Sequence, residues 1–234
     1  MKVLGLKMPN RRLYSRYQYI RKIVNSFFPK ILFRLSPIQF SARLHWKNQN
    51  EGDLHGFDKY ICYHTRVPII ISEIKARVPY NSSILDIGCN CGYYLSLLKK
   101  EGFNNLSGVD ISPAAIQYGK EHFDLKNVNL TVGSFEEVFP VFSKQKKQYD
   151  LVYSLGATIE LVHPSFDIVG SMCEISKRYI VLIISEWGHD YPRFWEYEFN
   201  RNGFSLVKSI RPYDGKTLDS DYAITNSLMV FQRI

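Results

Sequence analysis

The sequence predicts an α/β protein with a mostly parallel, seven-stranded sheet, helices on both faces of that sheet and a helical N-terminal extension. From residue 80 onward, short apolar runs alternate with amphipathic stretches, as in parallel strands joined by crossover helices. A turn of small residues follows the first apolar run, and the second run ends in a carboxylate. We therefore expect the sheet to occupy residues 80–234 and a basic helical extension or cap to occupy residues 1–79.

The apolar runs give the strands in chain order. We expect strands at residues 83–87, 106–110, 128–132, 149–154, 179–185, 204–210 and 223–231. The patterns between them predict helices near residues 92–102, 113–123, 157–176 and 192–202. Ser112 and Pro113 suit the N-cap and the first turn of the second of these helices. The last two strands have no helix between them, so they should form an antiparallel pair at the edge of the sheet.

The positive charge of the chain lies in its first fifth. Residues 1–50 carry eleven Lys or Arg and no Asp or Glu, whereas the rest of the 234 residues carry 19 basic and 22 acidic ones. Apolar residues recur there at helical spacing, with arginines between them: Leu13, Tyr17, Ile20, Val24, Phe27 and Phe28. Pro29 should end or kink this helix.

Several interpretations of this basic segment stay open. The helix could be a cap packed over the ligand site, or it could lie on an anionic membrane, which residues 1–50 would contact peripherally. It could also bind an anionic substrate, with nucleic acid the less favoured partner, and its composition fits a transit peptide as well. Farther along, residues 46–80 predict a polar loop and two short helices, on which Tyr60, His64 and Arg66 are candidates to face the ligand or an acceptor.

Composition argues against several classes of protein. The longest apolar run, residues 179–184, is far too short to cross a bilayer. No cleavable signal peptide is evident. The spacing of the cysteines is not that of a disulfide framework. Cys89 and Cys91 could form one metal-ligand pair, but no second pair has zinc spacing. The cysteines are Cys62, Cys89, Cys91 and Cys173. We therefore expect a cytoplasmic protein without a metal site.

The turn after the first strand is the strongest functional signal. It runs from Asp86 to Gly92, and Asp110 closes the next strand. The helix that follows would offer backbone N–H groups to a ligand, and a carboxylate at Asp110 would lie where a ribose diol binds. Asn90 stands where a dinucleotide-binding turn often has glycine, and asparagine tolerates the left-handed conformation. Asp86, still on the strand, could receive an ammonium group, which a pyrophosphate does not offer.

These segments resemble motif I of the class I S-adenosylmethionine-dependent methyltransferases, D/E-x-G-x-x-x-G, and the acidic residue that ends that family's second strand. The resemblance excludes the N-terminal third of the chain. It implies a Rossmann-like methyltransferase fold with an inserted antiparallel last strand, and S-adenosyl-L-methionine as the cofactor. The cofactor-binding residues that it implies are Asp86, Gly88, Cys89, Asn90, Gly92, Asp110, Ile111, Ser134, Phe135 and Leu155.

The family's remaining motifs imply contacts with the adenine and a place for the acceptor. Ser134 or Glu136 should contact the adenine edge, and Phe135 should flank its ring. The loop after residues 149–154 resembles motif IV, next to the methyl group, and it carries no acidic metal ligands of the catechol type. An oxygen acceptor often needs a base of near-neutral pKa. His163, just beyond that loop, is the best candidate, with a structural role in a pre-proline turn as the alternative.

A second polar cluster follows the fifth strand. Glu186 and His189 lie there at the same sheet edge, where Trp187, Tyr191 and Trp195 could wall an acceptor pocket or belong to the core. We expect a methyltransferase that acts on a hydroxyl of a small molecule or sugar. An RNA or protein acceptor, and a cofactor-binding module without turnover, remain alternatives. The sequence predicts no oligomeric state.

Overall fold

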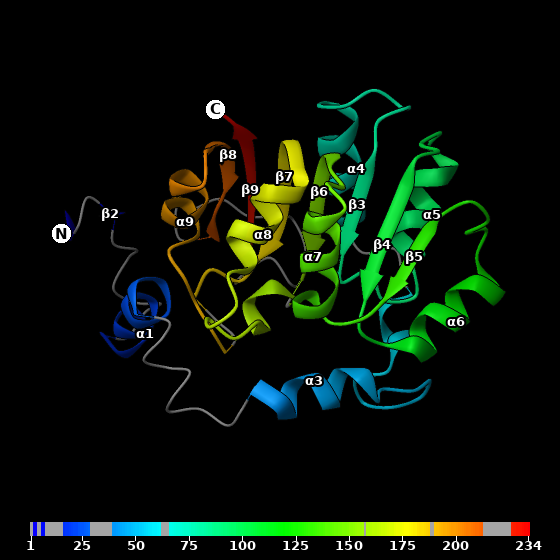
Figure 1. Cartoon of the computed structure of the whole chain (residues 1–234), viewed down its shortest axis with the longest axis horizontal. Helices are drawn as coiled ribbons and strands as arrows, with labels where there is room; N and C mark the ends of the chain where they lie inside the picture. Colours follow the sequence, from blue (N-terminus) through cyan, green and yellow to red (C-terminus); the bar gives the residue numbers. More distant parts are fainter. Residues whose placement is uncertain are drawn as a thin grey trace.

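The centre of the protein is a seven-stranded sheet in the order β5-β4-β3-β6-β7-β9-β8 (Figure 1). The computed structural model describes residues 2–3, 6–7, 16–28, 39–61, 66–156, 158–187, 190–212 and 226–234. The strands of the sheet are β3 (Ile84–Ile87), β4 (Leu106–Asp110), β5 (Asn129–Val132), β6 (Tyr149–Leu155), β7 (Ser176–Ile184), β8 (Phe204–Ile210) and β9 (Ser227–Arg233). All neighbours pair in parallel except β9, which is antiparallel to β7 and β8. The predicted fold, with its inserted antiparallel last strand, is confirmed.

Each face of the sheet carries three helices. One face packs against α4 (Arg66–Lys75), α5 (Tyr93–Lys100) and α6 (Pro113–His122). The other packs against α7 (Phe135–Lys144), α8 (Ile168–Ile175) and α9 (Trp195–Arg201). Successive side chains of a strand point to opposite faces, and the buried stretch of β7 from Ile180 to Ile184 is apolar throughout. Ile180, Leu182 and Ile184 face α7–α9, whereas Val181 and Ile183 face α4–α6.

Two helix predictions were wrong on this core. The helix α7 was not predicted, although Ser134 and Glu137 form a capping pair in which the Ser134 N–H donates to Glu137 Oε2 (2.9 Å). The helix predicted at 157–176 is shorter, because Gly156 takes a positive φ of 75° and Pro164 interrupts the chain. A single 3₁₀ turn, η2 (Ile159–Leu161), precedes α8 instead.

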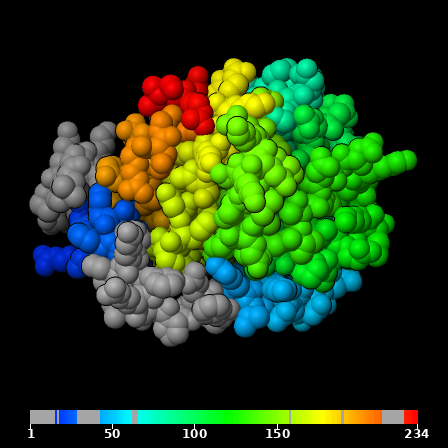
Figure 2. Space-filling view, viewed as in Figure 1, coloured from blue at the N-terminus to red at the C-terminus, as the bar shows by residue number. Residues whose placement is uncertain are grey.

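The N-terminal segment contributes two helices at different places. The helix α3 (Gln39–Lys47) runs along the edge of the molecule at the carboxyl ends of the central strands, whereas α1 (Arg16–Phe27) lies to one side, near α9 (Figure 1). A 3₁₀ turn, η1 (Phe57–Tyr60), links α3 to α4, and β1 (Lys2–Val3) pairs with β2 (Leu6–Lys7). The space-filling view shows α3 as a band under the core (Figure 2). The domain boundary at residues 79 and 80 stays a prediction.

The helix α1 begins and ends close to where the sequence predicted, but its orientation differs. Leu13 and the side chain of Tyr17 lie outside the described residues. Ile20, which was expected on the buried face, is 57% exposed, while Lys22 is only 3% exposed. A polar face of α1 is therefore the one that packs on the core. Within the described ranges, none of the helices is both long enough and apolar enough to span a bilayer.

Candidate active site

The turn from Asp86 to Gly92 takes a tight, left-handed path. Gly88 has φ 76° and Asn90 has φ 51°, as the sequence predicted for Asn90. A Cβ at Gly88 would lie 2.3 Å from Thr158 Cγ2, so a larger residue does not fit there. The Asn90 side chain accepts a hydrogen bond from the Cys91 N–H (2.6 Å), which stabilises the turn. The absence of a side chain at Gly88 thus lets the turn pack closely against Thr158.

Asp110, at the end of β4, is held by the same turn. Its Oδ2 accepts from the Asn90 N–H and its Oδ1 from the Ser112 N–H, each at 2.8 Å. Burial raises the pKa of this carboxyl, and these backbone hydrogen bonds oppose the rise. The carboxylate is therefore fixed in orientation at the edge of the sheet.

Asp86 lies behind the turn. Its side chain is 1% exposed, and its Oδ2 accepts from the Tyr153 hydroxyl (2.8 Å). Burial raises the pKa of Asp86 to about 8, and the charge of Asp110 adds to the rise. Among the predicted cofactor residues, Asp86 and Gly92 are not part of the cavity lining described next.

A cavity of about 690 Å³ opens at the carboxyl ends of β3, β4 and β6. That volume falls within the range of roughly 300–1,000 Å³ typical of small-molecule sites. The predicted residues that line it are Gly88, Cys89, Asn90, Asp110, Ile111, Ser134, Phe135, Leu155 and His163. The structure therefore brings together residues from the ends of four strands, as the topology of an open α/β sheet requires.

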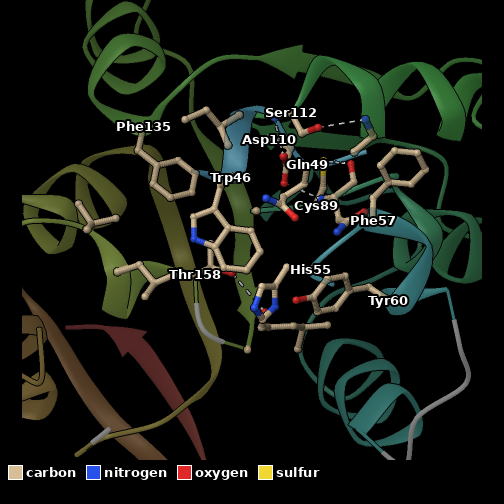
Figure 3. A pocket seen from close by; sticks show the side chains of 18 of the residues that line it. Trp46, Gln49, His55, Phe57, Tyr60, Cys89, Asp110, Ser112, Phe135 and Thr158 are labelled. Atoms are coloured by element: carbon tan, nitrogen blue, oxygen red, sulfur yellow. Dashed lines mark hydrogen bonds between the residues drawn. The ribbon is translucent and has the colours of Figure 1, made fainter. Parts of the chain in front are cut away.

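The opposite wall comes from the N-terminal segment. Trp46 and Gln49 reach in from α3 and its end, and His55, Phe57 and Tyr60 follow from the next segment (Figure 3). The ring of Trp46 lies 5.8 Å from that of His55. Tyr60 had been singled out from the sequence, whereas Trp46, Gln49 and His55 had not. Their stretch reads as a polar loop, and only the aromatic residues within it hint at a buried contact.

His163 lies at the far side of the cavity and is 2% exposed. Its Nδ1 lies 2.8 Å from Ser165 Oγ and accepts from the Ser165 backbone N–H (3.1 Å), a contact that favours the neutral tautomer with its proton on Nε2. Its Nε2 has no hydrogen-bond partner in the described part of the chain. Burial, reinforced by the charge of Arg193, lowers the pKa of His163 below its ordinary value. The imidazole is therefore neutral at pH 7.

Cations outnumber acids on the described lining. Arg43, Lys59 and Arg66 line the cavity, as do Asp110 and Glu136. Arg43 forms an ion pair with Glu136. The guanidinium of Arg66 lies beside the loop after β6, since a Cβ on Gly156 would be 3.6 Å from Arg66 Nη1.

Of the described residues in the second polar cluster, Glu186, Trp187 and Trp195 do not line the cavity. Glu186 is ion-paired with Arg211 (2.8 Å), and Trp187 and Trp195 are buried elsewhere. Tyr191 is the member of this group that lines the cavity. His64 and His189 lie outside the described residues.

Comparisons with known proteins agree with this geometry. The family model described as "Methyltransferase domain" matches residues 84–178. EEF1A lysine methyltransferase 2 of Mus musculus is 33% identical over 109 residues, which cover 42% of this chain and 45% of that protein. Malonyl-[acyl-carrier protein] O-methyltransferase of Acetivibrio thermocellus is 31% identical over 127 residues, which cover 54% of this chain and 41% of that protein. The chain thus spans less than half the length of the curated relatives that it matches.

Solved structures share the fold. A TehB-like S-adenosylmethionine-dependent methyltransferase from Corynebacterium glutamicum has a TM-score of 0.54 at 19% identity, over 74% of this chain and 89% of the other. Magnesium protoporphyrin IX methyltransferase from Synechocystis PCC 6803, crystallised with S-adenosylmethionine, has a TM-score of 0.53 at 12% identity, over 96% of this chain and 100% of the other. Such low identities establish the fold alone. The motif I turn, Asp110 and the family match together identify a methyltransferase domain at residues 84–178, within the fold of the class I S-adenosylmethionine-dependent methyltransferases.

Proposed function

We propose that the chain transfers a methyl group from S-adenosyl-L-methionine to an oxygen of a small acceptor, a hydroxyl of a small molecule or a sugar. The observation that carries the proposal is one cavity that joins the motif I turn and Asp110 to a side that holds His163. The cofactor supplies a methyl group already activated by its sulfonium. The chain's own residues therefore have to bind the cofactor, orient the acceptor and remove the proton from the acceptor hydroxyl.

The cofactor side of the cavity fits an adenosyl ligand. Asp110 would accept the ribose hydroxyls, and the missing Cβ at Gly88 lets the turn pack directly against Thr158, which also lines the cavity. Asp86 and Gly92 would support the turn from behind. The other residues that we assign to the cofactor are Cys89, Asn90, Ile111, Ser134, Phe135 and Leu155.

The charge of the cavity favours an acceptor that carries a negative group. Glu136 is already paired with Arg43, and Asp110 faces the backbone of the turn. Lys59 is likewise paired with Asp58 (3.0 Å), so the charge argument rests on the described lining as a whole, which carries three cations and two acids. That surplus would disfavour an amine acceptor. A carboxylate or phosphate beside the hydroxyl would gain from the same charges.

His163 is placed to act as the general base. In the neutral tautomer whose Nδ1–H donates to Ser165 Oγ, Nε2 has no partner among the described residues and can accept a proton from a hydroxyl. The Ser165 backbone N–H, which donates to Nδ1, favours the opposite tautomer, so catalysis requires the one in which Nδ1–H faces Ser165 Oγ instead. Ser165 would therefore stabilise the imidazolium and orient the ring.

The curated relatives point to two kinds of acceptor. One is named an O-methyltransferase and the other a lysine methyltransferase. A protein lysine acceptor is the second candidate for this chain, and it rests on that relative alone. The cationic acceptor side favours the oxygen acceptor.

Transfer of labelled methyl groups to a panel of acceptors tests the proposal. The panel contains neutral sugars, sugar phosphates, hydroxy acids, lysine peptides and RNA. We expect label in a hydroxylated anion, as a methyl ether that resists mild alkali, whereas a methyl ester would release methanol. Arg66→Gln should raise KM for the charged acceptor, and Lys120→Gln, at an exposed position on α6, should not. Label found in lysine peptides or RNA alone would overturn the proposal.

A further inference from the structure

The helix α1 packs on the segment that follows β7, far from it in sequence. Asn25 Nδ2 donates to Pro192 O (2.8 Å), and the Phe194 N–H donates to Ser26 Oγ (3.0 Å). Asn25 and Ser26 are both buried. Buried hydrogen bonds cost more to break than exposed ones, because the groups left behind are not solvated. These two contacts therefore tie residues 190–194 to α1.

Lys22 anchors the same helix through a buried ammonium group. Its Nζ lies 3.4 Å from the centre of the Trp187 ring, and the side chain is almost fully buried. Burial lowers the pKa of Lys22 to about 7, against the attraction of Glu186 and with a further decrease from Arg211. Ammonium groups are buried only where partners compensate for the lost water. The burial of Lys22 therefore costs solvation free energy, which its contact with the Trp187 ring and its attraction to Glu186 offset.

The segment held by α1 on one side forms part of the cavity wall on the other. The Tyr191 N–H donates to Glu160 O (3.0 Å), and the Tyr191 ring lies 5.1 Å from that of His163. Arg193 Nη2 donates to Val162 O (3.0 Å). Tyr191, Val162 and His163 all line the cavity, whereas no described residue of α1 does. Residues 190–194 thus lie between α1 and the loop that carries the candidate base.

We infer that α1 is a positioning element for the acceptor side of the cavity. It presses residues 190–194 against residues 158–163 and so fixes Tyr191 and His163. The assignment of that side to the acceptor rests on the proposed function, but the mechanical coupling does not. If α1 loosens, the competent arrangement is populated less often, and apparent acceptor affinity falls by that fraction. The motif I turn, built from β3 and β4, keeps its shape.

An isosteric variant isolates this coupling in the full chain. Asn25→Asp keeps the volume but replaces the donor with a carboxylate oxygen that faces Pro192 O. Ile20→Ala, on the exposed face of the same helix, is the matched control. In hydrogen exchange, we expect peptides covering 190–194 and 158–165 to exchange about tenfold faster in Asn25→Asp only. Peptides covering residues 84–92 and 106–112 should be unchanged in both variants.

A second readout reports on the base itself. In NMR titrations of the imidazole, His163 should titrate at a higher pH in Asn25→Asp, because a looser wall admits water. Ser26→Ala, which removes the acceptor for the Phe194 N–H and a hydrogen bond to Glu198, should act in the same direction with less risk to folding. For an acceptor found by the panel, KM should rise more than kcat falls.

Calorimetry with S-adenosylhomocysteine separates this inference from the proposed function. We expect the variants to keep the wild-type affinity to within about twofold, because the cofactor side is untouched. Absence of binding in every protein, wild type included, would remove the proposed function and leave the coupling standing. Unchanged exchange at residues 190–194 and an unchanged His163 titration in both Asn25→Asp and Ser26→Ala would overturn the inference.

Discussion

Binding of S-adenosyl-L-methionine should release a proton from Asp86. Burial raises the pKa of Asp86 to about 8. At pH 7 the carboxyl is then protonated in roughly nine of ten ligand-free molecules. The cofactor brings positive charge to the turn that follows Asp86. At an effective dielectric constant of about 20, a unit charge ~5 Å away stabilises the carboxylate by about 3 kcal/mol, or roughly two pKa units. The pKa of Asp86 in the complex should therefore fall to about 6.

The sign of the pH dependence follows from these two states. The free protein holds the proton and the complex does not, so a higher pH favours the complex. Between pH ~6 and ~8 the affinity should rise by up to tenfold per unit, about 1.4 kcal/mol. Above pH ~8 Asp86 is ionised in both states, and the affinity should level off.

Calorimetry in two buffers with different ionisation enthalpies measures this proton directly. At pH 7 the apparent binding enthalpies in the two buffers should differ by close to the difference between the buffers' ionisation enthalpies, which corresponds to about one proton released per cofactor bound. Asp86→Asn, of nearly equal volume, should abolish the difference, and Asp124→Asn, an exposed partner of Lys99, should keep it. S-adenosylhomocysteine retains the ammonium but lacks the sulfonium, so equal proton release with both ligands would identify the ammonium as the charge that acts. Identical wild-type enthalpies in both buffers, with a flat affinity from pH 6 to 8, would refute the reasoning.

Three further predictions concern the two sides of the cavity and the N-terminal segment. Asp110→Ala should weaken cofactor binding by roughly 1.5–3 kcal/mol, since charge-assisted hydrogen bonds to the ribose are lost, and an unchanged Kd in calorimetry would contradict this assignment. His163→Ala should lower turnover by about 10²–10⁴-fold at constant cofactor affinity. Wild-type kcat should rise with pH through a pKa below 6.5, because the base acts when neutral. Residues 1–50, with a net charge of +11, should sediment with vesicles of anionic lipid at low salt and release at 1 M, where the Debye length is about 3 Å. Pelleting that salt does not change would argue against an electrostatic contact.

The sheet and the cofactor turn were predictable because short-range patterns determine them. A strand such as β7, buried on both faces, reads as a continuous apolar run. The turn after β3 needs Gly88 and Asn90 in left-handed conformations, and that requirement is visible in the residue types. Asp110 could be placed as well, since the end of a strand fixes where its last side chain lies.

The wall built by α3 could not be predicted in the same way. The residues around Trp46 and His55 are polar and irregular, and their contact with the cavity depends on where α3 docks. The prediction of which face of α1 is buried was wrong for a related reason. Its apolar stripe predicted a buried Ile20, but the buried face carries Lys22, whose partner Trp187 lies more than 160 positions away. Local periodicity predicts that a helix forms; partners so distant in sequence decide which face it buries.

The two sides of the cavity differ in how they are held, and this difference separates cofactor binding from acceptor choice. The cofactor side comes from strand ends and one turn, all within residues 84–155, where the family model matches. The side that we propose for the acceptor is assembled from α3, residues 158–163 and residues 190–194, which only tertiary contacts bring together. Substitutions in α3 or in residues 190–194 can therefore reshape the acceptor wall without disturbing the hydrogen bonds that orient Asp110. Class membership accordingly follows from the first side, and acceptor specificity should follow from the second, with α1 as its outer support.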